Sequence, residues 1–245
     1  MNKYVLCLTA LSFALLTFSS FGFSEKSQNT SPEELIEKIH WLCQSAVKID
    51  TDGQVIYFDP YRIKKSDKAD IILISHKHDD HLSVGDISKI AHKNTVFIAP
   101  EDCVQDLAKV KKSKIIPMEP GMKTNVNGIL IEAVPAYNIV KTKFHPKENK
   151  WMGYTLTIHG VKIYHAGDTE RIPEMKDFTC DIAMVPLGQT YTMNDVKEAA
   201  NAVIDTQAKI AIPIHYGLYE GKADDAVEFK KLLKDKVNVI IKKQE

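Results

Sequence analysis

Apolar and polar residues alternate along this chain in short stretches that predict β-strands joined by a few helices. Two apolar runs flank Asp52-Gly53, a pair typical of tight turns, so residues 46–59 are expected to form a hairpin. Residues 70–75 form a continuous apolar run, the pattern of a strand buried on both faces. The same spacing rules predict helices over residues 32–40, 83–92, 100–110, 192–205 and 223–235, and further strands over residues 95–99, 114–118, 123–126, 129–134, 151–158, 161–165, 181–186, 209–214 and 237–241.

Capping residues mark where the predicted helices begin. Ser31 and Glu34 have the spacing of a capping box at the start of the first helix. Ser83 can cap the second helix, and either Thr192 or Asn194 can cap the fourth.

The order of these elements indicates one α/β architecture. The strands come in two batches, and each batch is followed by helices. Two mixed sheets packed face to face with outer helices, a four-layer αββα sandwich, satisfy that order. Residues 25–245 are expected to form a single domain of this kind. Residues 135–150 are polar and irregular, and long loops of this kind usually carry function.

The N-terminal segment has the pattern of an export signal. Lys3 precedes an apolar run over residues 5–18, and small residues allow cleavage after Gly22 or Ser24. The run is shorter than the ~20 apolar residues of a membrane span, and an uncleaved anchor is the alternative. Residues 1–24 are therefore expected to be a signal peptide. The mature protein is expected in the periplasm or outside the cell, with no stable membrane insertion.

Charge and cysteine content narrow the class of protein. Lys plus Arg and Asp plus Glu both number 32, so the net charge is zero and nothing indicates nucleic-acid binding. Beyond the signal, Cys43, Cys103 and Cys180 are widely spaced and form no Cys-x-x-Cys pair. Buried thiols are the simpler expectation, with one disulfide as the alternative.

The segment after the buried strand carries the clearest chemistry. It places three histidines and two aspartates together: His76, His78, Asp79, Asp80 and His81. Imidazole and carboxylate groups are the usual ligands of zinc, iron and manganese. His76 and His78 alternate on an extended chain, so both can face one way, while Asp80 and His81 can turn toward a second point. So many histidines in a polar surface loop would have no packing rationale.

The pattern His76-x-His78-x-Asp80-His81 resembles the signature of the metallo-β-lactamase superfamily of binuclear metal hydrolases. Residues 164–169 resemble its later Gly-Asp segment, and residues 212–217 resemble the segment with its last metal-binding histidine. Asp59-Pro60-Tyr61 is similar to a turn in the branch related to ascorbate-6-phosphate lactonase. The resemblance covers nearly the whole mature chain and implies the αββα fold.

The resemblance also implies two bound divalent ions, with zinc expected and iron or manganese as alternatives. The implied ligands are His76, His78 and His145 for the first ion, Asp80, His81 and His215 for the second, and Asp168 as the bridge. The family places a histidine after the strand over residues 129–134, where this chain has Tyr137-Asn138. His145, from the following loop, is therefore the expected ligand. The alternative is a surface His145, with Tyr137 or water completing the shell.

Two neighbouring segments could support or line this site. His165 adjoins the Asp168 loop, so a supporting role and a purely structural role are both open. Thr190, Tyr191 and Thr192 follow a strand end and could line the pocket, although helix capping is the simpler account of Thr192.

These features predict a metal-dependent hydrolase. Two ions about 3.5–4 Å apart can hold a bridging hydroxide at neutral pH. That metal-bound hydroxide is expected to cleave an ester, lactone, amide or phosphodiester bond of a small molecule, with Asp80 orienting the nucleophile. Lys141, Lys143 and Lys147 would suit an anionic substrate, or they form a solvated charge run. An iron-dependent redox enzyme and a non-catalytic metal or small-ligand binding protein are the alternative functions. The sequence makes no prediction of oligomeric state.

Overall fold

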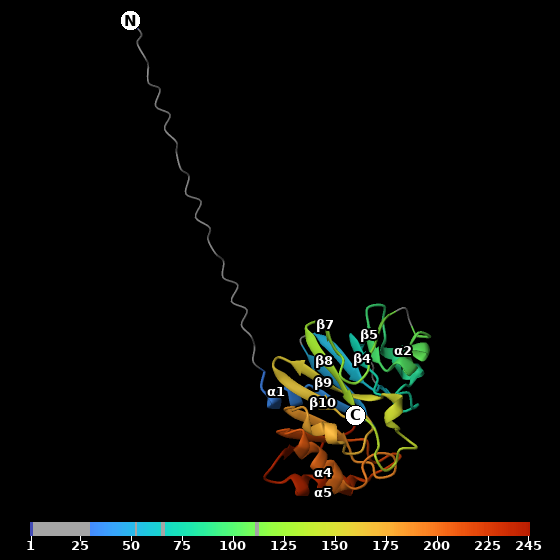
Figure 1. The fold of residues 1–245 in the computed structure, drawn as a ribbon, viewed down its shortest axis with the longest axis vertical. Helices are drawn as coiled ribbons and strands as arrows, with labels where there is room; N and C mark the ends of the chain where they lie inside the picture. Colours follow the sequence, from blue (N-terminus) through green and yellow to red (C-terminus); the bar gives the residue numbers. More distant parts are fainter. Residues whose placement is uncertain (2–29, 52, 65–66, 111–112) are drawn as a thin grey trace.

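The computed structural model describes residue 1 and residues 30–51, 53–64, 67–110 and 113–245. Residues 2–24 of the predicted signal peptide and Asp52 therefore lie outside the described residues. Two β-sheets pack face to face, with α2 beside the first sheet and α4 and α5 beside the second (Figure 1). This arrangement is the predicted αββα sandwich.

Both sheets keep their strands in chain order. The first contains β1 (Ile39–Cys43), β2 (Ala46–Thr51), β3 (Gln54–Phe58), β4 (Ile71–Leu73), β5 (Val96–Ala99) and β6 (Lys114–Pro117). The second contains β7 (Lys123–Val126), β8 (Ile129–Pro135), β9 (Met152–Ile158), β10 (Val161–His165), β11 (Ile182–Pro186), β12 (Ile210–Ile214) and β13 (Asn238–Val239). Strands β1 to β3 and β7 to β10 pair antiparallel, whereas β3 to β6 and β10 to β13 pair parallel. The predicted hairpin over residues 46–59 is confirmed, and the predicted strands over residues 151–158 and 161–165 pair with each other antiparallel.

Helices cover the outer faces. The α-helices are α1 (Pro32–Ile36), α2 (Val84–Ile90), α3 (Val104–Leu107), α4 (Val196–Asp205) and α5 (Ala223–Leu233), and three short 3-10 turns are η1 (Glu101–Cys103), η2 (Lys147–Asn149) and η3 (Pro173–Lys176). Ile87 of α2 and Leu107 of α3 share a buried cluster with Ile72 and Phe97 of the first sheet. Val203 of α4 and Phe229 of α5 belong to the larger core that includes the second sheet.

Strand β4 shows the consequence of a continuous apolar run. Ile71 and Leu73 belong to the core between the sheets, whereas Ile72 and Ile74 belong to the cluster under α2 and α3. Burying each such side chain stabilises the fold by about 1.5–3 kcal/mol. The strand is therefore held from both sides, and the histidine-rich segment that follows it begins from a rigid support.

Two predictions about helix ends were wrong. The first helix ends at Ile36, and residues Ile39–Cys43 form β1. Ile39, Trp41 and Cys43 are buried and alternate with less buried residues, which is the two-residue period of a strand paired with β2. Helix α4 is capped by Asp195, whose side chain accepts a hydrogen bond from the Glu198 amide, because Thr192 is used elsewhere.

The three described cysteines fit the simpler expectation. Cys43, Cys103 and Cys180 are buried and free, and they form no disulfide with one another. Burial raises the pKa of the Cys180 thiol to about 12, so this group stays protonated. Within the described part of the chain, no helix combines the length and apolar character needed to cross a membrane.

Strand ends from both sheets meet at one edge of the sandwich. The segment after β4 accepts a hydrogen bond from β9 across the sheets, from Met152 N to Ser75 O at 3.2 Å. The residue after β12 makes a similar link, from His215 N to the carbonyl of Gln44 in the β1–β2 turn at 3.0 Å. These links fix the two sheets to each other where the chemically active residues lie.

Candidate metal centre

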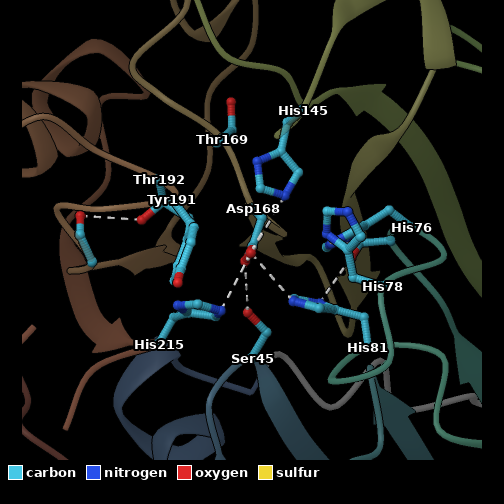
Figure 2. A network of polar contacts seen from close by, with 12 residues as sticks. Ser45, His76, His78, His81, His145, Asp168, Thr169, Tyr191, Thr192 and His215 are labelled. Carbon is cyan, nitrogen blue, oxygen red and sulfur yellow. Dashed lines mark hydrogen bonds and ion pairs between the residues drawn. The ribbon is translucent and has the colours of Figure 1, made fainter. Parts of the chain in front are cut away.

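All seven predicted ligands come together at this edge. The potential donor atoms form three groups, and within each group they lie no more than 4.8 Å from one another. The groups are His76, His78 and His145; His76, His81 and Asp168; and Asp80, His81 and His215. We call the first of these the three-imidazole group and the last the carboxylate-bearing group. They share no residue, and Asp168 lies between them (Figure 2).

Asp168 occupies the centre of the cluster. Its Oδ2 atom lies 3.3 Å from His81 Nε2, 3.3 Å from His215 Nε2 and 3.6 Å from His145 Nε2. Gly167 has a φ of +63°, and a Cβ atom there would lie 2.9 Å from the Ser75 Cβ. The turn that delivers Asp168 therefore needs glycine both for its left-handed backbone and for its close approach to Ser75.

The donor atoms fit divalent metal ions. The Nε2 atoms of His81 and His145 are buried and, among the described residues, have no hydrogen-bond partner. Buried polar atoms are seldom left without a hydrogen bond. A metal ion between these nitrogens and the Asp168 carboxylate, which lies 3.3 and 3.6 Å from them, would satisfy both sides. A set of imidazole nitrogens with carboxylate oxygens suits zinc, iron or manganese. The chemistry of the residues therefore fits the metals that the sequence implied.

Asp59 supports the first strand-end segment. Its Oδ2 atom accepts hydrogen bonds from Ser75 Oγ at 2.7 Å and from His81 Nδ1 at 2.8 Å, and its Oδ1 accepts from the Ser75 amide at 2.7 Å. Asp59 is fully buried and has a left-handed φ of 43°. A non-glycine residue held in that conformation stores strain, which is common at functional sites. Asp59 thereby fixes the ring of His81 with Nε2 toward Asp168.

Glu220 supports the other side and was missed by sequence reasoning. Its Oε1 atom lies 2.9 Å from His215 Nδ1, and its Oε2 accepts hydrogen bonds from the amides of Thr190 and Tyr191 at 2.9 and 2.7 Å. A Cβ atom at Gly188 would lie only 1.7 Å from Glu220 Oε1, so glycine leaves the space for this carboxylate. His215 itself has a left-handed φ of 56°.

Burial and charge give the histidines opposite protonation preferences. Burial lowers the pKa of His145 to about 4 and that of His76 well below its usual value. Burial alone would do the same to His81, but the carboxylates of Asp168 and Asp59 raise the pKa of His81 to about 10. Asp168 likewise raises the pKa of His215 well above its usual value despite burial. Without metal, the histidines of the three-imidazole group are therefore neutral at neutral pH, whereas His81 and His215 are protonated.

In the loop over residues 135–150, the two candidate ligands, Tyr137 and His145, make different contacts. Tyr137 is not a candidate ligand, because its hydroxyl donates to Glu174 Oε2 at 2.8 Å, away from the cluster. His145 is buried beside His76 and His78, with ring centroids 5.0 and 5.1 Å apart. The loop therefore delivers the histidine that the family pattern lacks at the strand end.

The lysines of this loop do not line the cavity at the cluster. Lys141 Nζ donates to the carbonyls of Gln189 and Met193 at 3.2 and 2.8 Å, and Lys147 pairs with Glu174 at 2.8 Å. Lys141 thus ties two loops together. Within the described residues, the cavity lining contains no lysine or arginine.

His165 has a supporting structural role. Its Nε2 atom donates to the carbonyl of Ser45 at 2.8 Å, its Nδ1 accepts from the Gly167 amide at 3.2 Å, and its ring stacks on Phe58. These contacts hold the turn that carries Asp168. His165 is not among the potential metal donors.

A cavity of about 380 Å³ opens directly over the cluster. Its lining consists of Tyr61, His78, Asp79, Asp80, Phe144, His145, Asp168, Tyr191, His215 and Tyr219. Of the three residues predicted to line a pocket, only Tyr191 does so; Thr192 is buried and donates to Gly188 O and Glu220 Oε1. Figure 2 shows the Tyr191 side chain directed toward His215.

Comparison with known proteins agrees with this geometry. A family model described as a beta-lactamase superfamily domain matches residues 38–215. A UPF0173 metal-dependent hydrolase from Thermococcus kodakarensis is 32% identical over 221 residues, which cover 83% of this chain and 95% of that protein.

Solved structures show the same fold. A proposed metal-dependent hydrolase from Parabacteroides distasonis superposes with a TM-score of 0.72 at 36% identity, covering 84% of this chain and 93% of that one. CmlA, a diiron β-hydroxylase from Streptomyces venezuelae, superposes with a TM-score of 0.64 at 11% identity, covering 84% of this chain and 52% of that one. The second likeness shows the fold alone, so the fold by itself does not separate hydrolysis from redox chemistry.

Proposed function

Because the chain belongs to the metallo-β-lactamase superfamily, in its UPF0173 family of metal-dependent hydrolases, we propose that it is a binuclear zinc hydrolase of small molecules. The bond that it cleaves is an ester, lactone, amide or phosphodiester bond. The turn at Asp59-Pro60-Tyr61, which resembles the branch related to ascorbate-6-phosphate lactonase, supports including lactones among the candidate substrates.

The position of Asp168 between two separate donor groups is the observation that carries this proposal. The three-imidazole group would hold one ion, the carboxylate-bearing group the other, and Asp168 would contact both. Ions bound there would polarise a carbonyl or phosphoryl oxygen and lower the pKa of a water molecule. The cavity over the cluster gives a substrate direct access to these positions.

Asp80 is the proposed catalytic residue of this chain. Its carboxylate lies 3.7 Å from His215 Nε2 and 3.8 Å from His81 Nε2, and it lines the cavity. Burial alone would raise the pKa of Asp80, but the charge of His81 and the contact with His215 lower it. The group is therefore ionised at neutral pH, so it would help to hold a metal ion and could accept a hydrogen bond from the attacking water molecule.

A metal analysis combined with a hydrolysis screen tests the proposal. Protein purified without added metal should contain about two equivalents of zinc, and it should hydrolyse at least one of a panel of lactones, acyl esters, amides and phosphodiesters. Predominant iron without hydrolysis would favour a redox enzyme instead. Bound metal without any turnover would favour a binding protein, and absence of transition metal would refute the proposal.

Export is a separate proposal that rests on residues 1–24. The apolar run over residues 5–18 after Lys3 supports a cleaved signal and a periplasmic or secreted mature protein. Mass spectrometry of the protein from its native host should find a chain that lacks the first 22–24 residues. An intact N-terminus in a membrane fraction would indicate an anchor.

A further inference from the structure

The cavity over the candidate metal centre has an aromatic wall. Four of its lining residues are Tyr61, Phe144, Tyr191 and Tyr219. The rings form two pairs: Tyr61 and Tyr219 join hydroxyl to hydroxyl with centroids 6.4 Å apart, and Phe144 meets Tyr191 edge to face at 4.9 Å. Tyr191 and Tyr219 remain 37% and 47% exposed, so part of each side chain is accessible to a ligand. We call these four side chains the aromatic cradle.

Each residue of the cradle lies close in the chain to a residue that belongs to the candidate metal centre or supports it, or is hydrogen-bonded to such a residue. Phe144 precedes His145, and Tyr219 precedes Glu220. Tyr61 lies two residues after Asp59, the partner of His81. The backbone of Tyr191 is pinned at both ends, because its amide donates to Glu220 Oε2 and its carbonyl accepts from Asn138 Nδ2, both at 2.7 Å. The cradle is therefore held in a fixed position relative to the donor atoms.

The charges around the cavity disfavour a heavily charged ligand. The other lining residues are three histidines and three carboxylates, Asp79, Asp80 and Asp168. No lysine or arginine of the described chain lines the cavity itself, so bound metal ions and His215 would supply the positive charge in the lining. The Arg62 guanidinium lies over the Tyr61 and Tyr219 rings, 5.4 and 5.8 Å from their centroids. A cavity of about 380 Å³ is at the small end of ligand pockets, which suits one ring and a short linked group.

We propose that the aromatic cradle binds an aromatic ring of the substrate, which places the adjoining carbonyl or phosphoryl group at the metal centre. The substrate class is thus a small ester, lactone, amide or phosphodiester with an aryl group beside the bond to be cleaved. Tyrosine and phenylalanine rings favour edge-to-face and offset contacts with another ring beyond simple area burial. This inference rests on the proposed function only for the reaction, because the ring-binding site itself can be measured without turnover.

Equilibrium binding of matched carboxylates tests the cradle. Phenylacetate and cyclohexylacetate carry the same charged group, and the saturated ring is the more hydrophobic. Titration of the purified protein by NMR should show phenylacetate binding about two- to tenfold tighter than cyclohexylacetate. Tyr219→Leu and Phe144→Leu should each reduce this preference, because leucine keeps an apolar surface without a ring.

Leu218→Ala is the matched control, since Leu218 is 40% exposed beside Tyr219 but does not line the cavity. It should leave the preference for phenylacetate unchanged. Equal or tighter binding of cyclohexylacetate, or a preference that survives both leucine variants, would overturn the inference. Failure of the hydrolysis screen with an intact ring preference would instead contradict the proposed function alone.

Discussion

The two donor groups of the candidate centre lie side by side but differ in their charge. The three-imidazole group is surrounded by other rings, including Trp151, which packs 4.8 Å from His76 and 5.0 Å from His78 between ring centroids. The carboxylate-bearing group has buried carboxylates behind both of its histidines, Asp59 behind His81 and Glu220 behind His215. One position is therefore ready to bind a metal ion without losing protons, whereas the other must release them first. The difference makes the two positions separable by mutation.

Removal of the shared Asp168 carboxylate should weaken metal binding at both positions. Asp168→Asn keeps the size of the side chain but removes the charge that faces three imidazoles. Both positions should lose metal affinity by at least about 100-fold, because even partners outside the ligand shell account for 10–100-fold. Elemental analysis after dialysis against a weak chelator measures this. Asp106→Asn, which alters only a surface ion pair with Lys109, is the control, and two retained equivalents of metal in Asp168→Asn would contradict the bridging role.

Loss of His145 should weaken metal binding only at the three-imidazole group. His145→Ala removes one of three imidazoles, so one metal equivalent should be lost or bound at least about 100-fold more weakly, since partners outside the ligand shell already account for 10–100-fold. Turnover should fall while the circular dichroism spectrum stays that of the wild type. His92→Ala is the control, since His92 lies in the loop after α2 and is not among the potential metal donors. If His145→Ala binds both ions with unchanged affinity, His145 is not a ligand.

Glu220→Gln should weaken metal binding only at the carboxylate-bearing group. The variant removes the charge beside His215 Nδ1 and replaces one of the two carboxylate oxygens with an amide donor, so the side chain can no longer accept from His215 Nδ1 and from the two backbone amides at once. Metal affinity at this position should fall by about 10–100-fold, and the three-imidazole group should keep its ion. Glu174→Gln is a matched control, because Glu174 also accepts hydrogen bonds in a loop but contacts Tyr137 and Lys147 instead. Simultaneous loss of both ions from Glu220→Gln would show that the groups are not independent.

The sequence predicted which residues form the cluster of candidate ligands better than it predicted the residues that support them, and the reason is physical. His76, His78, Asp80 and His81 follow a buried run, so a local pattern places them together. Glu220 gave no such signal, because its contacts with His215 and with residues 29 and 30 positions earlier form only in the folded chain. Strand β1 was missed for a similar reason, since its alternation becomes decisive only through pairing with β2.

The smallest expected effect is the pH dependence of the stability of the metal-free protein. The three-imidazole group should lower the stability at acid pH, and the carboxylate-bearing group should lower it at alkaline pH. His145 has a pKa of about 4 in the folded state against an ordinary 6.5, so the unfolded chain binds more protons between those values. The stability that His145 contributes is therefore lost as the pH falls from 6.5 toward 4. His81 has a pKa of about 10, so its contribution is complete below pH 6.5 and is lost as the pH rises toward 10.

Thermal unfolding of the metal-free protein should thus show lower Tm values at both ends of the pH range, with about 2–4 °C for each kcal/mol in a chain of this size. His145→Ala should flatten the acid side and His81→Ala the alkaline side. A wild-type Tm that does not change between pH 4.5 and 6.5, with an alkaline decline still present, would mean that the three-imidazole group is not held neutral by burial.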